Sequence, residues 1–443
     1  MKKKLEIGLI GNPCAGSLSP LLHSVLAKAC GISLCYHLWE TPEEELRPLV
    51  LSMAKQDLAG MNVTIPYKGK VLPTLAGASP LARTLGAANT LIKTSKGFYG
   101  ANTDVYGFVS FLKHRGISLA GRDCLLLGSG GAAKAVAYAM ASDGARIFVW
   151  SRNEEKQREF LDHMNGLFPG SFAYCGDSEL VGRFYSMMVN TIPLAAEYEN
   201  VLLYDRIRAS LWVDINYSVS GTPLEELATE RGIAFADGKE MLFYQGLRSF
   251  EIWNDRLFEK EEAEALLNEF LSRAKRKIVL VGFMGTGKST VSCLLEKMAG
   301  FERVSTDLKL ETDSGMSISR LFAEKGESYF RGLESAALAD ILAAESPCSV
   351  DCGGGIVLRE ENRTRIGASG ALTVWLDCDE AVLLERLRGD RVRPLLAGKS
   401  DEEIIALIRG RREYYRQVAD FTVDASRDPL ITAKEIMKKW SES

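Results

Sequence analysis

A glycine-rich segment from Gly282 to Ser289 has the residue types and spacing of a phosphate-binding loop. It reads Gly-Phe-Met-Gly-Thr-Gly-Lys-Ser, follows a strand-like run at 277–281 and precedes an amphipathic stretch at 290–298. The glycines let backbone N–H groups converge on phosphate oxygens, the Lys288 ammonium neutralises those oxygens, and the Ser289 hydroxyl can ligate Mg²⁺. We therefore predict ATP and Mg²⁺ as ligands, although this loop alone does not separate a small-molecule kinase from an ATPase, a GTPase or a switch. Lys288 is also predicted to be catalytic. The residues predicted to bind the nucleotide are Gly282, Gly285, Thr286, Gly287, Lys288, Ser289 and Thr290.

A second glycine-rich turn, at 128–133, indicates a dinucleotide site. It reads Gly-Ser-Gly-Gly-Ala-Ala between a strand-like run and an alanine-rich helical stretch, but Ala133 replaces the third fingerprint glycine, so the fingerprint is partial. The next strand-like run, 146–150, ends in Ser-Arg-Asn instead of an acidic residue, and an arginine there favours a 2′-phosphate and hence NADP(H). The alternative is that Arg152 is only a solvated loop charge. The predicted cofactor-binding residues are Gly128, Ser129, Gly130, Gly131, Ala132, Ser151, Arg152, Asn153 and Lys156.

Both turns lie in an alternation of strand-like and helical stretches that is typical of parallel α/β proteins. The chain has 443 residues, and at roughly 150 residues per domain this length predicts about three domains. Segment 254–277 is rich in Glu, Lys, Ala and Leu and has no proline or glycine, which predicts one or two helices. We place a domain boundary near Arg276.

Composition and charge exclude several classes of protein. With 46% hydrophobic and 25% charged residues the chain should fold, and its net charge of −4 provides no field for nucleic acid. No apolar run approaches the ~18–20 residues needed to cross a bilayer. The nine cysteines form no C-x-x-C pairs, so we expect reduced thiols and a cytoplasmic location. The expected partners are small molecules, with no nucleic acid, no membrane and no obligate protein partner.

The C-terminal segment carries further motifs that bear on the phosphoryl acceptor. They are Asp307 with Glu311, Gly326-Glu327-Ser328-Tyr329-Phe330-Arg331 followed by Glu334, Gly353-Gly354-Gly355, Val392-Arg393-Pro394-Leu395-Leu396, and Arg411 before Tyr415. On these motifs residues 276–443 resemble shikimate kinase over essentially their whole length.

This resemblance implies roles for individual residues. Asp307 would be catalytic, because an aspartate beside the acceptor hydroxyl can orient it and take its proton, and Arg393 would be a catalytic lid arginine that reaches the phosphates. Taken singly, Arg331 could instead pair with Glu334 on a helix, and Asp307 could cap a helix. The residues implied to bind shikimate are Asp307, Arg331, Gly353, Gly354, Gly355 and Arg411.

One position departs from the kinase pattern. Where the family usually has D-x-D, this chain has Ser305-Thr306-Asp307, so the aspartate usually linked to Mg²⁺ through water is missing. Asp351 stands two residues before the triple glycine, where many P-loop enzymes place an acidic strand end. We predict Ser289 and Asp351 as the residues that serve the metal.

The N-terminal part carries a different set of motifs. They are Gly11-Asn12-Pro13 with Ser17-Leu18-Ser19-Pro20, Asn62-Val63-Thr64-Ile65-Pro66-Tyr67-Lys68, Gly86-Ala87-Ala88-Asn89-Thr90, Asn102-Thr103-Asp104, and Asp237-Gly238 leading to Met241 and Gln245. On these motifs the chain resembles shikimate dehydrogenase from near the N-terminus to about Leu271.

The dehydrogenase resemblance implies a catalytic pair, Lys68 and Asp104. Reduction of a ketone needs a proton for the developing alkoxide, and a lysine beside a carboxylate can deliver it. Gly16 replaces the usual histidine before Ser17, so the carboxylate end of the site should be shaped differently. The residues implied to bind the polyhydroxy acid are Ser17, Ser19, Thr64, Asn89, Asp104, Tyr217 and Gln245.

The fold class expected from these motifs is α/β. A discontinuous substrate lobe (1–101, completed by 237–271) and a Rossmann-like NADP lobe (102–236) precede a P-loop kinase domain with a parallel sheet (276–443). The two resemblances together predict reduction of 3-dehydroshikimate to shikimate with NADPH, followed by phosphorylation of shikimate by ATP. Two alternatives stay open: a kinase-like domain that only binds nucleotide and regulates, and an NAD-linked quinate or shikimate dehydrogenase.

Overall fold

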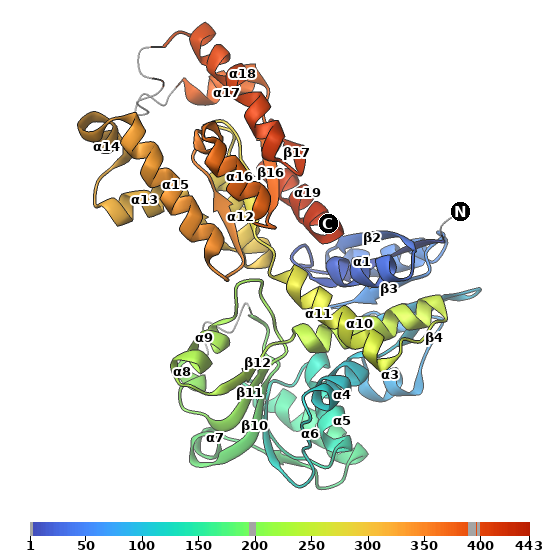
Figure 1. The fold of residues 1–443 in the computed structure, drawn as a ribbon. Helices are drawn as coiled ribbons and strands as arrows, with labels where there is room; N and C mark the ends of the chain where they lie inside the picture. Colours follow the sequence, from blue (N-terminus) through green and yellow to red (C-terminus); the bar gives the residue numbers. More distant parts are fainter. Residues whose placement is uncertain (1–2, 195–200, 389–395, 397–398) are drawn as a thin grey trace. The chain divides into compact units, whose positions relative to one another are not determined.

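The computed structural model describes residues 3–194, 201–388, 396 and 399–443, and these fall into two compact units, Met1–Leu271 and Ser272–Ser443. Within the described ranges no helix is long and apolar enough to cross a membrane. Each unit is built on sheets with helices on their faces (Figure 1). The predicted α/β fold class is confirmed.

The first sheet of the N-terminal unit is mixed and has the strand order β2-β1-β3-β5-β6-β4. β1 pairs in parallel with β2 and β3, whereas β5 is antiparallel to both β3 and β6. The elements are β1 (Lys4–Gly11), α1 (Ser19–Ala29), β2 (Ser33–Glu40), α2 (Glu43–Met53), β3 (Gly60–Val63), β4 (Gly77–Ala78), α3 (Pro80–Leu85), β5 (Thr90–Thr94) and β6 (Gly97–Ala101).

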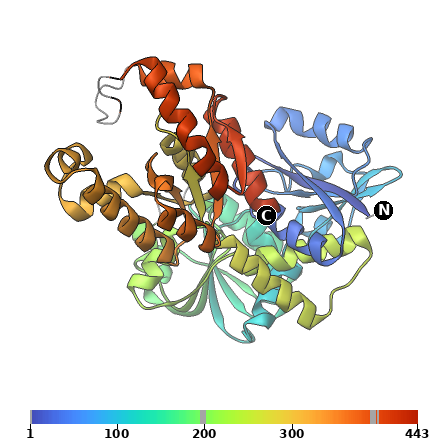
Figure 2. The same cartoon turned by 45° about the horizontal axis from the view of Figure 1, so that its top comes forward.

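The second sheet is wholly parallel, in the order β12-β11-β10-β7-β8-β9, and its strands lie side by side in teal and green in Figure 2. Its central strand β7 is apolar on both faces because helices cover both: Cys124 and Leu126 pack in one core, Leu125 and Leu127 in the other. The elements are α4 (Asp104–His114), β7 (Asp123–Leu127), α5 (Gly131–Ser142), β8 (Arg146–Trp150), α6 (Glu154–Leu167), β9 (Phe172–Tyr174), α7 (Asp177–Gly182), β10 (Phe184–Asn190), α8 (Val201–Tyr204), β11 (Arg208–Asp214), α9 (Pro223–Glu230) and β12 (Ala234–Ala236).

After β12 the chain returns to the first sheet through α10 (Lys239–Asn254). Two glycines allow this close packing: a Cβ on Gly246 would lie 2.8 Å from the Leu22 side chain of α1, and a Cβ on Gly107 of α4 would lie 2.8 Å from Gln245 Cβ. α10 therefore joins elements of both sheets. α11 (Lys260–Ala274) follows, within the segment 254–277 that was predicted to be helical.

The C-terminal unit has one parallel sheet, in the order β14-β15-β13-β16-β17. All four residues of β13 are buried, as expected for the central strand of a sheet covered on both faces. The elements are β13 (Ile278–Val281), α12 (Lys288–Ala299), β14 (Glu302–Ser305), α13 (Thr306–Ser314), α14 (Ile318–Lys325), α15 (Glu327–Ala343), β15 (Cys348–Asp351), α16 (Glu360–Ala368), β16 (Leu372–Asp377), α17 (Glu380–Leu387), α18 (Asp401–Val418), β17 (Phe421–Asp424) and α19 (Pro429–Glu442).

Candidate active sites

The Lys68 ammonium donates a hydrogen bond of 2.7 Å to Asp104 Oδ2 in the N-terminal unit. Lys68 follows β3, and Asp104 is the first residue of α4, so the pair joins the first sheet to the helix that leads into the second. The Lys68 side chain is 18% exposed and that of Asp104 only 5%. A buried carboxylate thus holds an ammonium that a ligand can still reach.

The Asn89 amide links Asp104 to Gln245. Asn89 Nδ2 lies 2.8 Å from Asp104 Oδ1 and 3.0 Å from Gln245 Oε1, and Asn89 Oδ1 accepts from the Thr103 backbone N–H at 2.7 Å. Gln245 comes from α10, which reaches α4 because Gly107 has no side chain. The structure therefore brings Lys68, Asn89, Asp104 and Gln245 together.

Ser17, Ser19 and Tyr217 form a second group. Ser17 Oγ donates to Ser19 Oγ at 3.1 Å. Burial raises the pKa of the Tyr217 phenol, while a hydrogen bond with Ser17 lowers it, so residues far apart in the sequence meet here. Thr64 directly follows β3, and its methyl group packs against Gly11.

The glycine turn after β7 approaches Lys68. A Cβ on Gly131 would lie 3.9 Å from Lys68 Cβ, and Gly128 has a φ of +109°, where a side chain would also collide with Thr191 Oγ1. Gly130 is the N-cap of α5, so the turn presents a helix N-terminus, as a dinucleotide phosphate requires. The residues present fit NADP(H).

The strand end after β8 contacts this turn through Ser151, whose Oγ lies 3.1 Å from Ser129 Oγ. Arg152 and Lys156 are exposed. Asn153 caps α6, because its Oδ1 accepts from the Lys156 backbone N–H at 2.9 Å. The asparagine therefore has a structural role beside the predicted one, and Ala132 lies half-buried at the start of α5.

A buried polar network behind Asn89 was not predicted. Asn62 Nδ2 donates to the Asn89 carbonyl oxygen and to Ser249 Oγ, both at 3.2 Å, and Asn62 Oδ1 contacts His23 Nε2 at 3.2 Å. Ser249 Oγ lies 2.7 Å from Thr90 Oγ1. Polar residues at buried positions of β3, β5 and α10 were the sign of this network in the sequence, but the pairing of Asn62 with Ser249, 187 positions apart, is visible only in the fold.

In the C-terminal unit the loop between β13 and α12 has the glycine conformations that the motif predicts. Gly282, Gly285 and Gly287 have φ values of +153°, +84° and +88°. The buried Lys288 donates to the carbonyl oxygens of Gly282 and Phe283 at 3.0 and 3.1 Å, so its ammonium lies within the loop. Thr286 closes the turn with a 2.9 Å hydrogen bond to the Phe283 carbonyl, and Ser289 and Thr290 are exposed on the first turn of α12.

Ser289 Oγ donates to Asp351 Oδ2 at 2.5 Å. Asp351 ends β15, which lies between β13 and β14, so its position beside the phosphate-binding loop follows from the strand order. Ser305, the residue in place of the missing aspartate, accepts a hydrogen bond from the Leu308 backbone N–H and caps α13. A hydroxyl–carboxylate pair of this kind supplies the oxygen atoms that Mg²⁺ prefers.

The three glycines after β15 each lie against a different partner. A Cβ on Gly353 would lie 2.7 Å from both Asp307 Oδ1 and Glu334 Oε1, and one on Gly355 would collide with the Arg331 guanidinium. The Gly354 carbonyl oxygen accepts from Arg411 Nη1 at 3.1 Å. The triple glycine therefore allows Asp307, Arg331 and Arg411 to gather around one stretch of backbone.

Glu334 is a member of this site that the predicted set omitted. It accepts from Arg331 Nη1 at 2.8 Å, and its side chain is 2% exposed. Burial raises the pKa of its carboxyl, the Asp307 carboxylate raises it further, and Arg331 opposes both effects. The sequence could have indicated Glu334 through its spacing, because Arg331 and Glu334 lie one helical turn apart on α15.

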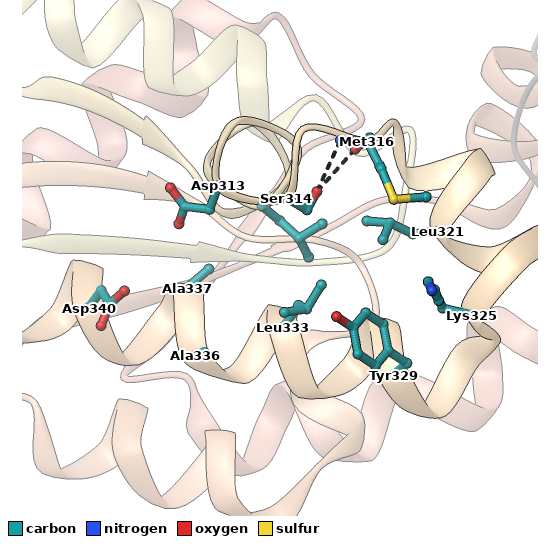
Figure 3. A pocket seen from close by; sticks show the side chains of 11 residues that line it. Asp313, Ser314, Met316, Leu321, Lys325, Tyr329, Leu333, Ala336, Ala337 and Asp340 are labelled. Carbon is teal, nitrogen blue, oxygen red and sulfur yellow. Dashed lines mark hydrogen bonds between the residues drawn. The ribbon is translucent and has the colours of Figure 1, made fainter.

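Arg393 lies outside the described residues. A cavity of about 240 Å³ opens among α13, α14 and α15 (Figure 3). Its lining includes Leu310, Lys325 and Tyr329 but none of the predicted site residues, so this cavity is separate from the groups around the triple glycine.

Comparison with known proteins assigns both units. A family model of the shikimate dehydrogenase substrate binding domain matches residues 9–91. The shikimate dehydrogenase (NADP(+)) of Carboxydothermus hydrogenoformans is 34% identical over 252 residues, covering 56% of this chain and 90% of that protein. The corresponding enzyme of Aquifex aeolicus is 34% identical over 250 residues, with the same coverage of both chains. The chain belongs to the shikimate dehydrogenase family.

Solved structures of this family share its fold. The chorismate mutase/shikimate 5-dehydrogenase fusion protein of Clostridium acetobutylicum superposes with a TM-score of 0.53 at 31% identity, covering 62% of this chain and 99% of that chain. The shikimate 5-dehydrogenase of Thermus thermophilus, solved with NADP(H) and shikimate, gives 0.51 at 27% identity, with 60% and 100% coverage. A family model of shikimate kinase matches residues 284–441, so this dehydrogenase also carries a kinase domain. The chain is a bifunctional enzyme of the shikimate pathway.

Proposed function

We propose that the N-terminal unit reduces 3-dehydroshikimate to shikimate with NADPH and that the C-terminal unit transfers the γ-phosphoryl group of ATP to the 3-hydroxyl of shikimate. The observation that carries the first reaction is the 2.7 Å Lys68–Asp104 pair beside the glycine turn at Gly131. NADPH supplies a hydride when bound. The relatives named for NADP support this cofactor.

In the first reaction Lys68 donates a proton to the substrate oxygen that becomes the hydroxyl of shikimate. Asp104 holds the ammonium in place, and Asn89 fixes Asp104 through its second carboxylate oxygen. Gln245 and the serine pair Ser17 and Ser19 supply hydrogen-bonding groups for the hydroxyls and carboxylate of the substrate, with Tyr217 and Thr64 beside them.

In the second reaction Asp307 orients the 3-hydroxyl of shikimate and accepts its proton as the oxygen attacks the γ-phosphorus. Arg331 and Arg411 bind the shikimate carboxylate through charge-assisted hydrogen bonds. Lys288 moves from the carbonyl oxygens of the loop to the phosphate oxygens, and Arg393, which lies outside the described residues, is assigned to the phosphates. Glu334 holds Arg331 in place.

For the metal we assign Ser289 as a ligand of Mg²⁺ and Asp351 as the carboxylate that holds the water shell of the ion. Mg²⁺ supplies positive charge that neutralises the β- and γ-phosphates. The Ser289–Asp351 hydrogen bond supports this assignment.

A coupled assay on the full-length protein tests both reactions. With 3-dehydroshikimate and NADPH alone we expect NADPH oxidation; after addition of Mg·ATP we expect ADP formation that depends on the shikimate just made. ADP formation that does not require shikimate, or its absence with shikimate supplied directly, contradicts the kinase assignment. NADH oxidation at the NADPH rate contradicts the cofactor assignment.

A further inference from the structure

Three side chains of different metal-binding types meet on the edge of the first sheet, among the residues that the structure describes: Glu6, Cys35 and His37. Glu6 is the register partner of Cys35 in the parallel pairing of β1 with β2, and His37 is two residues after Cys35. Side chains two apart in a strand share a face, and register partners in neighbouring strands share it too. All three therefore project from the same face of the sheet, where they are half-buried.

The distances between the donor atoms suit a common ion. His37 Nε2 lies 3.0 Å from Glu6 Oε1 and 3.3 Å from Cys35 Sγ, and the three donor atoms lie within 4.8 Å of one another. In a tetrahedral zinc site with bonds of about 2.0–2.3 Å, neighbouring donor atoms are separated by roughly 3.3–3.8 Å. Small side-chain adjustments bring the three groups to that geometry.

Glu6 already has two partners, because Oε1 faces His37 Nε2 and Oε2 accepts from the exposed Lys4 ammonium at 3.4 Å, but the contact between His37 and the Cys35 thiol is poorly matched. One ring nitrogen either donates its N–H to the Glu6 carboxylate or accepts from the Cys35 thiol, but it cannot do both. Thiol sulfur is a weak acceptor, so a bond shared between Glu6 and Cys35 leaves the sulfur poorly matched. A cation removes the conflict: once the Cys35 thiol releases its proton to water and His37 carries its N–H on Nδ1, all three groups can each give the ion a lone pair.

We propose that Glu6, Cys35 and His37 bind a Zn²⁺ ion, with water as the fourth ligand. The thiolate and imidazole favour Zn²⁺ over Mg²⁺ or Ca²⁺, which prefer oxygen ligands only. Trp39 stacks on His37 with the ring centroids 5.3 Å apart and orders the imidazole.

The ion would fasten the edge strand β2 to β1. β2 ends at Glu40, whose carboxylate accepts from the Cys14 and Ala15 backbone N–H groups in the loop that leads to Ser17. Zinc would therefore stabilise a strand that also holds a loop of the dehydrogenase unit.

Metal titration of the full-length protein, stripped of metal and kept in excess Mg²⁺, tests the proposal. We expect one equivalent of Co²⁺ to give a thiolate-to-cobalt charge-transfer band with the intense visible absorption of a tetrahedral site, and Zn²⁺ to abolish both. Cys35→Ser should remove the charge-transfer band, while His37→Gln and Glu6→Gln should each weaken Zn²⁺ binding at least roughly tenfold. Zn²⁺ should also raise the melting temperature of the wild type but not of Cys35→Ser.

Cys293→Ser, which removes a half-buried thiol from α12 of the other unit, is the matched control and should leave the cobalt spectrum unchanged. A spectrum without the thiolate band, or one that survives Cys35→Ser, overturns the proposal. Zn²⁺ binding that none of the three substitutions weakens overturns it as well.

Discussion

Ser305 and Asp351 are register partners in the parallel pairing of β14 with β15, so the carboxylate at the end of β15 stands beside the position where the kinase resemblance predicts one. Ser305 caps α13, and Asp351 accepts a hydrogen bond from Ser289 in the first turn of α12. The hydroxyl at 305 thus serves the helix, while the charge lies one strand nearer to the phosphate-binding loop. Substitutions at Asp351 and Ser305 should therefore have different effects on Mg²⁺-dependent kinase activity.

Asp351→Asn removes the negative charge at this position but keeps nearly the same side-chain shape. We expect the Mg²⁺ concentration for half-maximal kinase activity to rise roughly 10- to 100-fold and turnover to fall, with shikimate affinity unchanged, because only the water shell of the ion loses its acceptor. Adding Ser305→Asp should restore part of the activity, since aspartate is also a good N-cap and returns a negative charge to this sheet edge. Asp340→Asn, an exposed carboxylate on α15, is the control; normal Mg²⁺ dependence in Asp351→Asn would remove the assignment.

Lys68 is assigned as the proton donor for ketone reduction. Lys68→Ala should lower dehydrogenase turnover roughly 10²–10⁴-fold, because the alkoxide then has no positioned acid, and should leave kinase activity unchanged. Lys70→Ala is the matched control, since Lys70 is more exposed and pairs with Glu43. The dehydrogenase and kinase rates should be measured on the same preparation of each variant. Near-normal ketone reduction by Lys68→Ala contradicts the role of Lys68 as proton donor, and equal loss of both activities indicates misfolding.

Local motifs account for the parts of both sites that the sequence could predict. The glycines at 128 and 282 have positive φ, and a Cβ on Gly353 or Gly355 would lie 2.7 Å or less from a neighbouring side chain, so a glycine at each of these positions predicts the local structure. Side chains that meet across the fold carry no such signal. The Asn62–Ser249 hydrogen bond and the contact of Ser17 with Tyr217 depend on how α10 and the turn after β11 return to the first sheet.

A residue's second role is equally hidden in the sequence. Asn153 was predicted to bind the cofactor from its place after β8, and the structure shows that it also caps α6. The sequence identified Ser305 only as the residue that replaces an aspartate, whereas the structure shows that it caps α13. Glu334 could have been included from its spacing to Arg331 on α15, but only the structure shows that the Asp307 carboxylate lies close enough to act on its pKa.

Arg152 is exposed at the end of β8, next to the Ser151–Ser129 contact. If it binds the 2′-phosphate of NADPH, Arg152→Ala should raise the KM for NADPH roughly 10- to 100-fold, the equivalent of one charge-assisted hydrogen bond, and change the KM for NADH little. Arg158→Ala on α6 is the control, because Arg158 is exposed but pairs with Glu154. An unchanged KM for both cofactors would show that Arg152 is a solvated charge, and an equal rise in both would show that it does not bind the 2′-phosphate.

The buried His23 predicts a specific loss of stability in acid. Burial lowers the pKa of its imidazole to about 3, although its hydrogen bond with Asn62 raises it, and the ring stacks on Tyr36. Because the folded pKa lies below the unfolded value of about 6.5, the unfolded state binds the proton first. The contribution of His23 to stability is therefore complete above pH 6.5 and is lost as the pH falls toward 3.

At pH 5 the loss from His23 should be about 2 kcal/mol of unfolding free energy relative to pH 7. His23→Gln keeps a donor near Nε2 but cannot take up a proton, so the stability difference between pH 7 and pH 5 should shrink by this amount. Urea unfolding at the two pH values, with the N-terminal unit followed through its dehydrogenase activity, measures the difference. Titrating carboxylates contribute equally to both proteins and cancel in the comparison. The same pH dependence in His23→Gln and the wild type would mean that His23 becomes protonated in the folded state, and the His23–Asn62–Ser249 network would then have to accommodate a charge.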